Sequence, residues 1–228
     1  LFRNPAAIDV AFQSGEASNS TAFQRIQARY RYTPRAGLEN TLQVAAGLRI
    51  AGHSVAVFDA MLADGVEDFR RQLAASCPDL VVLYEDNYNF LSKMCLGAMR
   101  EAACAMIGAA AGAGARVVVA GSDATDAPDP YLAAGADVVL IGEGLSALRA
   151  LVDRLDAHRS IGAAEWIGGL GGVATKAHGN LVHGRFGGAL PEPDPPPLAA
   201  WDLIDVERYR AVWLQAHGRF SLNMAASR

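Results

Sequence analysis

The chain has 228 residues, of which 51% are hydrophobic and 19% charged, and its formal net charge at pH 7 is −4. This length allows one large domain, or one domain with an appendage, and the composition excludes a chain that is disordered throughout. A negative charge without any basic run argues against nucleic acid as a partner. The longest uncharged stretch near the middle, 102–115, is too short to span a bilayer, so we expect no membrane partner.

Three cysteines, Cys77, Cys95 and Cys104, lie 18 and 9 residues apart. Neither gap suits a zinc or iron–sulfur site, and an odd number of cysteines argues against a disulfide framework. No signal peptide is visible. We therefore expect a reduced, cytoplasmic protein whose own side chains hold no metal.

Five short apolar runs alternate with helical patterns along the first two thirds of the chain. The runs are Ala7–Phe12, Ser54–Asp59, Asp79–Tyr84, Arg116–Ala120 and Asp137–Ile141. They are rich in Val, Leu and Ile without alternation, which is typical of parallel strands buried on both faces. The alternation predicts a doubly wound α/β domain over residues 5–158. Its five-stranded parallel sheet is expected to have the flavodoxin-like, Rossmann-type strand order 2-1-3-4-5.

Beyond this domain the sequence becomes rich in glycine and proline. Two short β-prone pieces, Val173–Lys176 and Asn180–His183, flank a His-Gly turn and predict a hairpin. We assign residues 159–205 to a hairpin linker. Residues 206–228 re-enter a helical pattern and end in a strand-like stretch, so we expect them to begin a further domain.

In open α/β sheets, ligands bind beyond the carboxyl ends of the strands, near the switch in strand order. The predicted strands end in "FQS", "YEDN", "AGSD" and "GEG". Glycine at the ends of the fourth and fifth strands leaves room for an extended group beside the backbone. The alternative is that Gly121 and Gly142 are ordinary turn glycines, and that Asp123, Asp126 and Glu143 are solvated loop acids.

Three common ligands of such sheets are not matched by these residues. A dinucleotide site needs several glycines directly after the first strand, where only Gly15 occurs, and a P-loop lysine is missing. A phospho-acceptor receiver domain needs an acid and a lysine where Gln13 and Gly142 stand. These absences weaken all three interpretations.

Five segments between Pro34 and Tyr209 carry a resemblance that covers residues 7–228. They are "PRAGLENTLQVAAGLRIAGHSVAVFDA", "CPDLVVLYEDN", "VVVAGSDATDAPDPYLAAGADVVLIGEGLSALRALVDRL", "IGGLGGVATKAHGNLV" and "AAWDLIDVERY". In this order and spacing they resemble the cobalamin-binding domain that precedes the catalytic barrel in cobalamin-dependent radical S-adenosylmethionine enzymes. Each motif is weak alone, and the specificity lies in the ordered set.

The resemblance implies that cobalamin (vitamin B12) lies over the strand ends, with its nucleotide tail in a slot beside the fourth and fifth strands. Glycines would leave room for the tail, and the hydroxyls of Ser122 and Thr125 would bond its phosphate or ribose. The residues expected at the cofactor are Tyr84, Glu85, Asp86, Asn87, Gly121, Ser122, Asp123, Thr125, Gly142, Glu143 and Gly144.

Two features depart from related proteins. Cobalamin mutases carry a cobalt-coordinating histidine after the first strand, but the loop from Gln13 to Pro34 contains none, so we expect no protein imidazole on cobalt. The radical enzymes hold a [4Fe–4S] cluster and S-adenosylmethionine with a Cys-x-x-x-Cys-x-x-Cys triplet, which is missing here. We therefore expect a fragment of a longer enzyme or a free-standing module, inactive alone.

The interpretation favoured by the sequence is a module that binds cobalamin and presents it to a radical S-adenosylmethionine domain of the same polypeptide, for methyl transfer or related radical chemistry. One alternative is a flavodoxin-like nucleotide- or flavin-binding enzyme domain, with Glu85, Asp86 or Glu143 as acid/base residues. A purely structural or interaction domain is the other. The substrate and the oligomeric state cannot be read from the sequence.

Overall fold

Helices alternate with strands through most of the chain, as the apolar runs predict. The computed structural model describes residues 9–14, 36–60, 63–85, 92–142, 144–177, 180–183 and 197–220. The strands are β1 (Asp9–Ser14), β2 (Ser54–Asp59), β3 (Leu80–Glu85), β4 (Arg116–Gly121), β5 (Val138–Leu140), β6 (Val173–Ala177) and β7 (Asn180–His183). The helices are α2 (Ala36–Ile50), α3 (Val66–Ser76), α4 (Ser92–Gly112), α5 (Ser122–Asp126), α6 (Asp129–Ala134), α7 (Leu145–Ala157), α8 (Ala163–Ile167), the 3₁₀-helix η1 (Trp201–Leu203) and α9 (Val206–His217).

All described strands belong to one sheet, in the order β2-β1-β3-β4-β5-β6-β7. Strands β1 to β5 pair in parallel, β6 pairs antiparallel with β5, and β7 pairs antiparallel with β6. The predicted class, an α/β domain around a mostly parallel sheet, is confirmed. The sheet has seven strands rather than five, because the hairpin predicted as part of a linker continues the sheet beyond β5.

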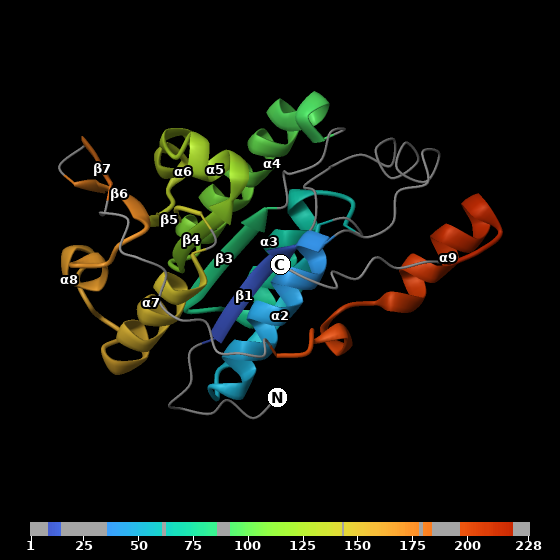
Figure 1. Cartoon of the computed structure of the whole chain (residues 1–228), viewed down its shortest axis with the longest axis horizontal. Helices are drawn as coiled ribbons and strands as arrows, with labels where there is room; N and C mark the ends of the chain where they lie inside the picture. Colours follow the sequence, from blue (N-terminus) through green and yellow to red (C-terminus); the bar gives the residue numbers. More distant parts are fainter. Residues whose placement is uncertain are drawn as a thin grey trace.

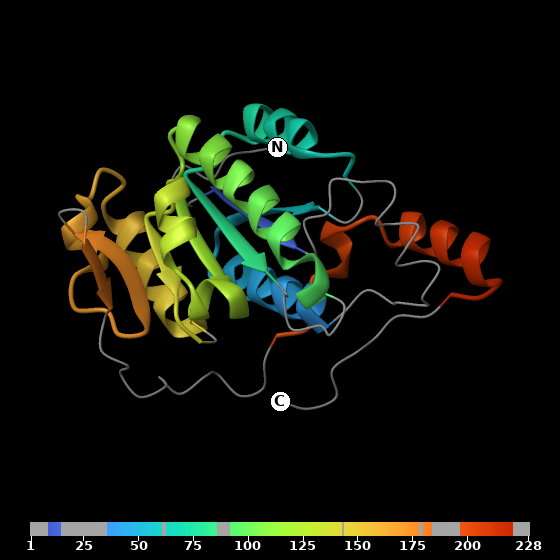
Figure 2. The same cartoon turned by 90° about the horizontal axis from the view of Figure 1, so that it is seen from above.

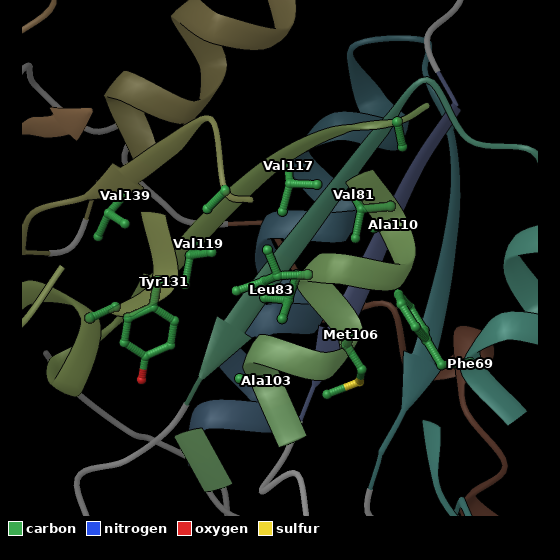
Figure 3. Packing of buried hydrophobic residues seen from close by; sticks show 14 of the residues in the cluster. Phe69, Val81, Leu83, Ala103, Met106, Ala110, Val117, Val119, Tyr131 and Val139 are labelled. Carbon is green, nitrogen blue, oxygen red and sulfur yellow. The ribbon is translucent and has the colours of Figure 1, made fainter. Parts of the chain in front are cut away.

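The sheet is buried on both faces, since successive residues of each strand point to opposite sides. On one side, Val81 and Leu83 of β3 pack with apolar residues of α3, α4 and α6. On the other side, Leu80 and Val82 pack with residues of α2 and α7 and with Trp166 of α8. Figure 1 shows the two helical layers on the sheet, and Figure 3 shows the first cluster from close by.

The later parts of the chain lie beside the two outermost strands of the parallel sheet, β5 and β2. The hairpin β6–β7 lies at one end of the molecule, and α9 lies at the other (Figures 1 and 2). Before α9, the backbone N–H of Ala200 donates to the carbonyl of Leu42 in α2 at 3.2 Å. Tyr209 of α9 is 3% exposed and packs against Leu42, so residues 197–209 extend the core beyond the β2 edge.

None of the helices within the described residues is long and apolar enough to cross a membrane.

Candidate functional site

The carboxyl ends of the parallel strands meet along one edge of the sheet, which we call the carboxyl edge. In register, Ser14 at the end of β1 lies beside Asp59 of β2, and Glu85 of β3 lies beside Gly121 of β4. The strand order reverses between β1 and β3, because the chain leaves β1 toward β2 on one side and leaves β3 toward β4 on the other. Ligands of doubly wound sheets bind beside such a switch in strand order.

Glycines occupy backbone conformations at this edge that other residues rarely adopt. The φ angles of Gly121, Gly142 and Gly144 are +154°, +76° and +65°. At Gly144 an added Cβ would also lie 2.5 Å from the Cβ of Leu140, which is an impossible contact. These turns therefore require glycine for the fold itself, whether or not a ligand approaches, and the turn-glycine interpretation accounts for Gly144 in full.

Asp123 is turned inward and held by two other elements. Its carboxylate accepts hydrogen bonds from Arg100 of α4, at 2.8 Å from Nε and 2.6 Å from Nη2, and from the Tyr131 hydroxyl of α6 at 2.6 Å. Burial raises the pKa of Asp123, but the hydrogen bonds from Arg100 and Tyr131 outweigh it and leave that pKa below its ordinary value. With 8% exposure, Asp123 is not a solvated loop acid, whereas Asp126 is exposed.

Thr125 connects the helix after β4 to the turn after β5. Its hydroxyl oxygen accepts from the backbone N–H of Gly142 at 3.1 Å and donates to the carbonyl of Leu140 at 3.5 Å. The short helix α5 thus follows β4 directly in the chain and is hydrogen-bonded through Thr125 to the end of β5 and the turn after it. Two of the expected cofactor residues, Asp123 and Thr125, hold other protein groups in place.

The remaining expected site residues are distributed around the same edge. Tyr84 is half-buried against the cluster under α2 and α7, and Ser122 is the half-buried first residue of α5. Glu85 pairs through its backbone with β4. The predictions for Asp86, Asn87 and Glu143 lie outside the described residues, as does most of the loop after β1.

The sequence did not indicate Arg100 and Tyr131, although they bind Asp123, the acid of α5 that was expected at the cofactor. Arg100 and its neighbour Glu101 are the charged pair within an otherwise apolar stretch of α4. That isolated pair is the only local signal, because an arginine inside an apolar helix needs a partner or solvent. The partner is 23 residues away, and no spacing in the sequence identifies it.

Histidines and metal-binding groups do not gather at the carboxyl edge in the part of the chain that the structure describes. His53 precedes β2 and His158 follows α7, so both lie at the opposite, amino edge. Among the described residues, no group of three or more His, Cys, Asp or Glu side chains is placed to hold a metal ion.

The amino edge has a different chemistry. Arg116, the first residue of β4, bonds to Asp137 at 3.1 Å and to the carbonyl of Ile161 at 2.7 Å, and its guanidinium carbon lies 5.2 Å from the ring centre of Trp166. A cavity of about 280 Å³ opens beside it. The ion pair between Arg159 and Asp79, at 2.8 Å, forms part of its wall.

Comparison with known proteins gives structural neighbours only. No protein-family model and no curated protein matches the chain. The cobalamin-dependent S-adenosylmethionine radical enzyme OxsB with aqua-cobalamin bound is similar, with 16% identity and a TM-score of 0.55 over 80% of this chain. The same values hold for OxsB with aqua-cobalamin and S-adenosylmethionine bound. The apo, selenomethionine-labelled OxsB gives 17% and 0.56 over 86% of this chain.

The chain spans only 23–24% of the OxsB chain that it matches. Identity this low shows a shared fold and leaves the activity open. The α/β domain described above therefore has the fold of one part of a cobalamin-dependent S-adenosylmethionine radical enzyme.

Proposed function

We propose that this chain binds cobalamin at the carboxyl edge of its sheet and presents it to a radical S-adenosylmethionine catalytic domain of the same polypeptide. The observation that carries the proposal is the fold, which matches part of OxsB with aqua-cobalamin bound over 80% of this chain, and part of apo OxsB over 86%. The ordered segments of the sequence and the strand order β2-β1-β3-β4-β5 of a Rossmann-type, flavodoxin-like sheet support it.

The carboxyl edge has features that suit a large cofactor with an extended tail. Ala120, Gly121 and Ser122 end β4 and begin α5 with small side chains, so the backbone there can be approached closely. Beside them, Gly142 in the turn after β5 has no side chain, and its φ is +76°. We assign the tail to the space beside these two strand ends. Tyr84, Glu85, Asp86, Asn87 and Glu143 are assigned to its surroundings.

Bound cobalamin would supply methyl-transfer or related radical chemistry, and the protein would supply binding and orientation. The histidines whose side chains are described, His53 and His158, lie at the amino edge. We propose that no protein imidazole coordinates cobalt, because the sequence from Gln13 to Pro34 contains no histidine. The [4Fe–4S] cluster and S-adenosylmethionine are assigned to the catalytic domain. With cobalamin as the methyl carrier, the whole enzyme would be a methyltransferase-like protein.

Retention of cobalamin by the purified chain tests the proposal. The chain is mixed with hydroxocobalamin, desalted, and examined for cobalamin absorbance at a molar ratio approaching one. FMN and ATP are tested in parallel, because the carboxyl edge of sheets with this strand order also binds flavin. Retained cobalamin supports the proposal. Loss of cobalamin together with retention of FMN or ATP would replace it by the flavin- or nucleotide-binding alternative.

A further inference from the structure

The helix α5, residues Ser122–Asp126, is fixed on one side by an ion pair in which the carboxylate of Asp123 is buried and the side chain of Arg100 is 32% exposed. Arg100 holds both oxygens of Asp123, and Tyr131 adds a third hydrogen bond to Oδ2. Tyr131 is fully buried, and Figure 3 shows it beside Val119 in the cluster under α4. A paired, fully hydrogen-bonded carboxylate of this kind restrains the backbone that carries it, because releasing it would leave a buried charge without partners.

On its other side, α5 is fixed by a neutral contact. The Thr125 hydroxyl bonds to both the Leu140 carbonyl and the Gly142 N–H, the groups on either side of Ile141. Asp123 and Thr125 therefore hold one five-residue helix between α4, α6 and the turn after β5.

Both glycine turns of the carboxyl edge are attached to this helix. Gly121 is the residue directly before α5, and the backbone N–H of Gly142 donates a hydrogen bond to the Thr125 hydroxyl oxygen. The distance between the ends of β4 and β5 is thus set by α5. Few other contacts can do this, because the strand pairing itself joins only Val118 and Val119 of β4 to Val138 and Val139 of β5.

We propose that Asp123 and Thr125 are positioning residues of the cofactor site, which hold the two glycine turns at the separation that the cofactor tail needs. This rests on the proposed function, and it changes the role of both residues from contact to support. The Asp123 oxygens already accept three hydrogen bonds from protein donors, which favours support over direct contact. Arg100 and Tyr131 belong to the same supporting set.

Four variants test this role. Asp123→Asn removes the charge held by Arg100, and Thr125→Val removes the hydroxyl at nearly constant volume. Thr125→Ser restores the hydroxyl and is the rescue. The matched control is Asp137→Asn at the amino edge, since Asp137 also pairs with an arginine, Arg116, and also accepts a second bond, from the Val117 N–H at 2.8 Å.

The dissociation constant for hydroxocobalamin and the thermal stability are measured for each variant. Residues that orient ligand-binding groups from behind typically change affinity about 10–100-fold, and we expect a loss in this range for Asp123→Asn and Thr125→Val. Thr125→Ser and Asp137→Asn should bind as the unchanged chain does. Amide hydrogen exchange of Gly142 should accelerate in Thr125→Val and return to its normal rate in Thr125→Ser.

Each other outcome is decisive. Unchanged affinity in both Asp123→Asn and Thr125→Val overturns the positioning role while the proposed function stands. An equal loss in Asp137→Asn also overturns it, because affinity would then follow general stability. A wild-type chain that binds no cobalamin overturns the proposed function, and the positioning role with it.

Discussion

The acids at the two edges of the sheet differ in their hydrogen-bond donors. At the carboxyl edge, Asp59 and Asp123 each accept a 2.6 Å hydrogen bond from a buried tyrosine, Tyr209 and Tyr131, and Asp123 also pairs with Arg100. At the amino edge, Asp79 and Asp137 pair with the partly exposed arginines Arg159 and Arg116. Positive-φ glycines occur at both edges, and those of the carboxyl edge, Gly121, Gly142 and Gly144, lie next to the helix that carries Asp123.

The charged groups at the amino edge pair across β3, β4 and the end of α7, so its cavity is walled by groups that already have partners. At the carboxyl edge, the buried carboxylate of Asp123 holds the short helix α5 beside the glycine turns, where we propose that the cofactor binds. The cavity and the proposed cofactor site therefore lie at opposite ends of the strands.

The largest expected effect is on cobalamin retention, and it comes from a valine in place of a glycine at the carboxyl edge but not at the amino edge. Gly121→Val should abolish cobalamin retention, because the side chain enters the space assigned to the tail. Gly114→Val, in the turn before β4, is the matched control: its φ of +85° gives a similar backbone strain, and an added Cβ meets nothing within 4 Å. Each variant should lose about 1–3 kcal/mol of stability from strain.

Desalting after incubation with hydroxocobalamin separates these outcomes, with circular dichroism to confirm that both variants are folded. Retention by a folded Gly121→Val variant would contradict the placement of the tail. Loss of retention in Gly114→Val as well would remove the distinction between the edges.

The next effect in size is on the free energy of unfolding, and it depends on pH. Burial, followed by the charge and hydrogen bond of Asp59, raises the pKa of Tyr209 well above its ordinary value, and the opposing influence of Arg208 is smaller. Because the pKa is raised in the folded state, the stabilisation is complete below the unfolded pKa of about 10 and is lost as the pH rises through the folded value. Tyr209→Phe should therefore be less stable than the unchanged chain by about 1–3 kcal/mol at pH 7.

The difference between the two proteins should shrink as the pH is raised from 9 to 11, as measured by urea denaturation at each pH. Arginines stay charged over this range, so the amino-edge pairs provide a pH-independent reference. If the difference in free energy of unfolding between the two proteins were constant with pH, the hydrogen bond that the protonated hydroxyl donates to Asp59 would not be its source.

The smallest effect is expected at the amino edge. The side chains of Arg159 and Asp79 are 47% and 33% exposed, and partly solvated pairs of this kind contribute only about 0–1 kcal/mol. Arg159→Ala should lower the free energy of unfolding by no more than this, and 1 M salt should remove the difference by screening. A loss of several kcal/mol in urea denaturation would show that this edge depends on its exposed charges after all.

The α/β class was readable from the sequence because the buried strands are continuous apolar runs. The bounds of β2 were predicted without error, since Gly52 and His53 precede the strand and the polar Asp59 ends its apolar run. By contrast, β1 was expected at Ala7–Phe12 and lies at Asp9–Ser14, where its pairing with β2 and β3 determines the register. The addition of the hairpin to the sheet was not predicted, because a two-residue turn reveals the hairpin and not its neighbour.

For the site, the sequence indicated the glycines correctly as turn positions, because strand ends followed by glycine have a local signature. It could not indicate that Asp123 faces Arg100 and Tyr131. That contact depends on how α4 and α6 pack on the same face of the sheet, and it joins residues 23 and 8 positions apart. Whether the cofactor touches the other expected residues remains a prediction that the experiments above address.

The contact between Tyr209 and Asp59 joins residues 150 positions apart, so it can form in the nascent chain only some time after Asp59 has been synthesised. Translation adds about 5–20 residues per second, so about 8–30 seconds pass between the synthesis of Asp59 and that of its partner. During this interval the edge strand β2 lacks its cover from Tyr209, and unprotected edge strands readily pair with other chains. Slower translation of the thirty codons that precede Tyr209 should therefore increase aggregation of this protein in cells more than slowing elsewhere.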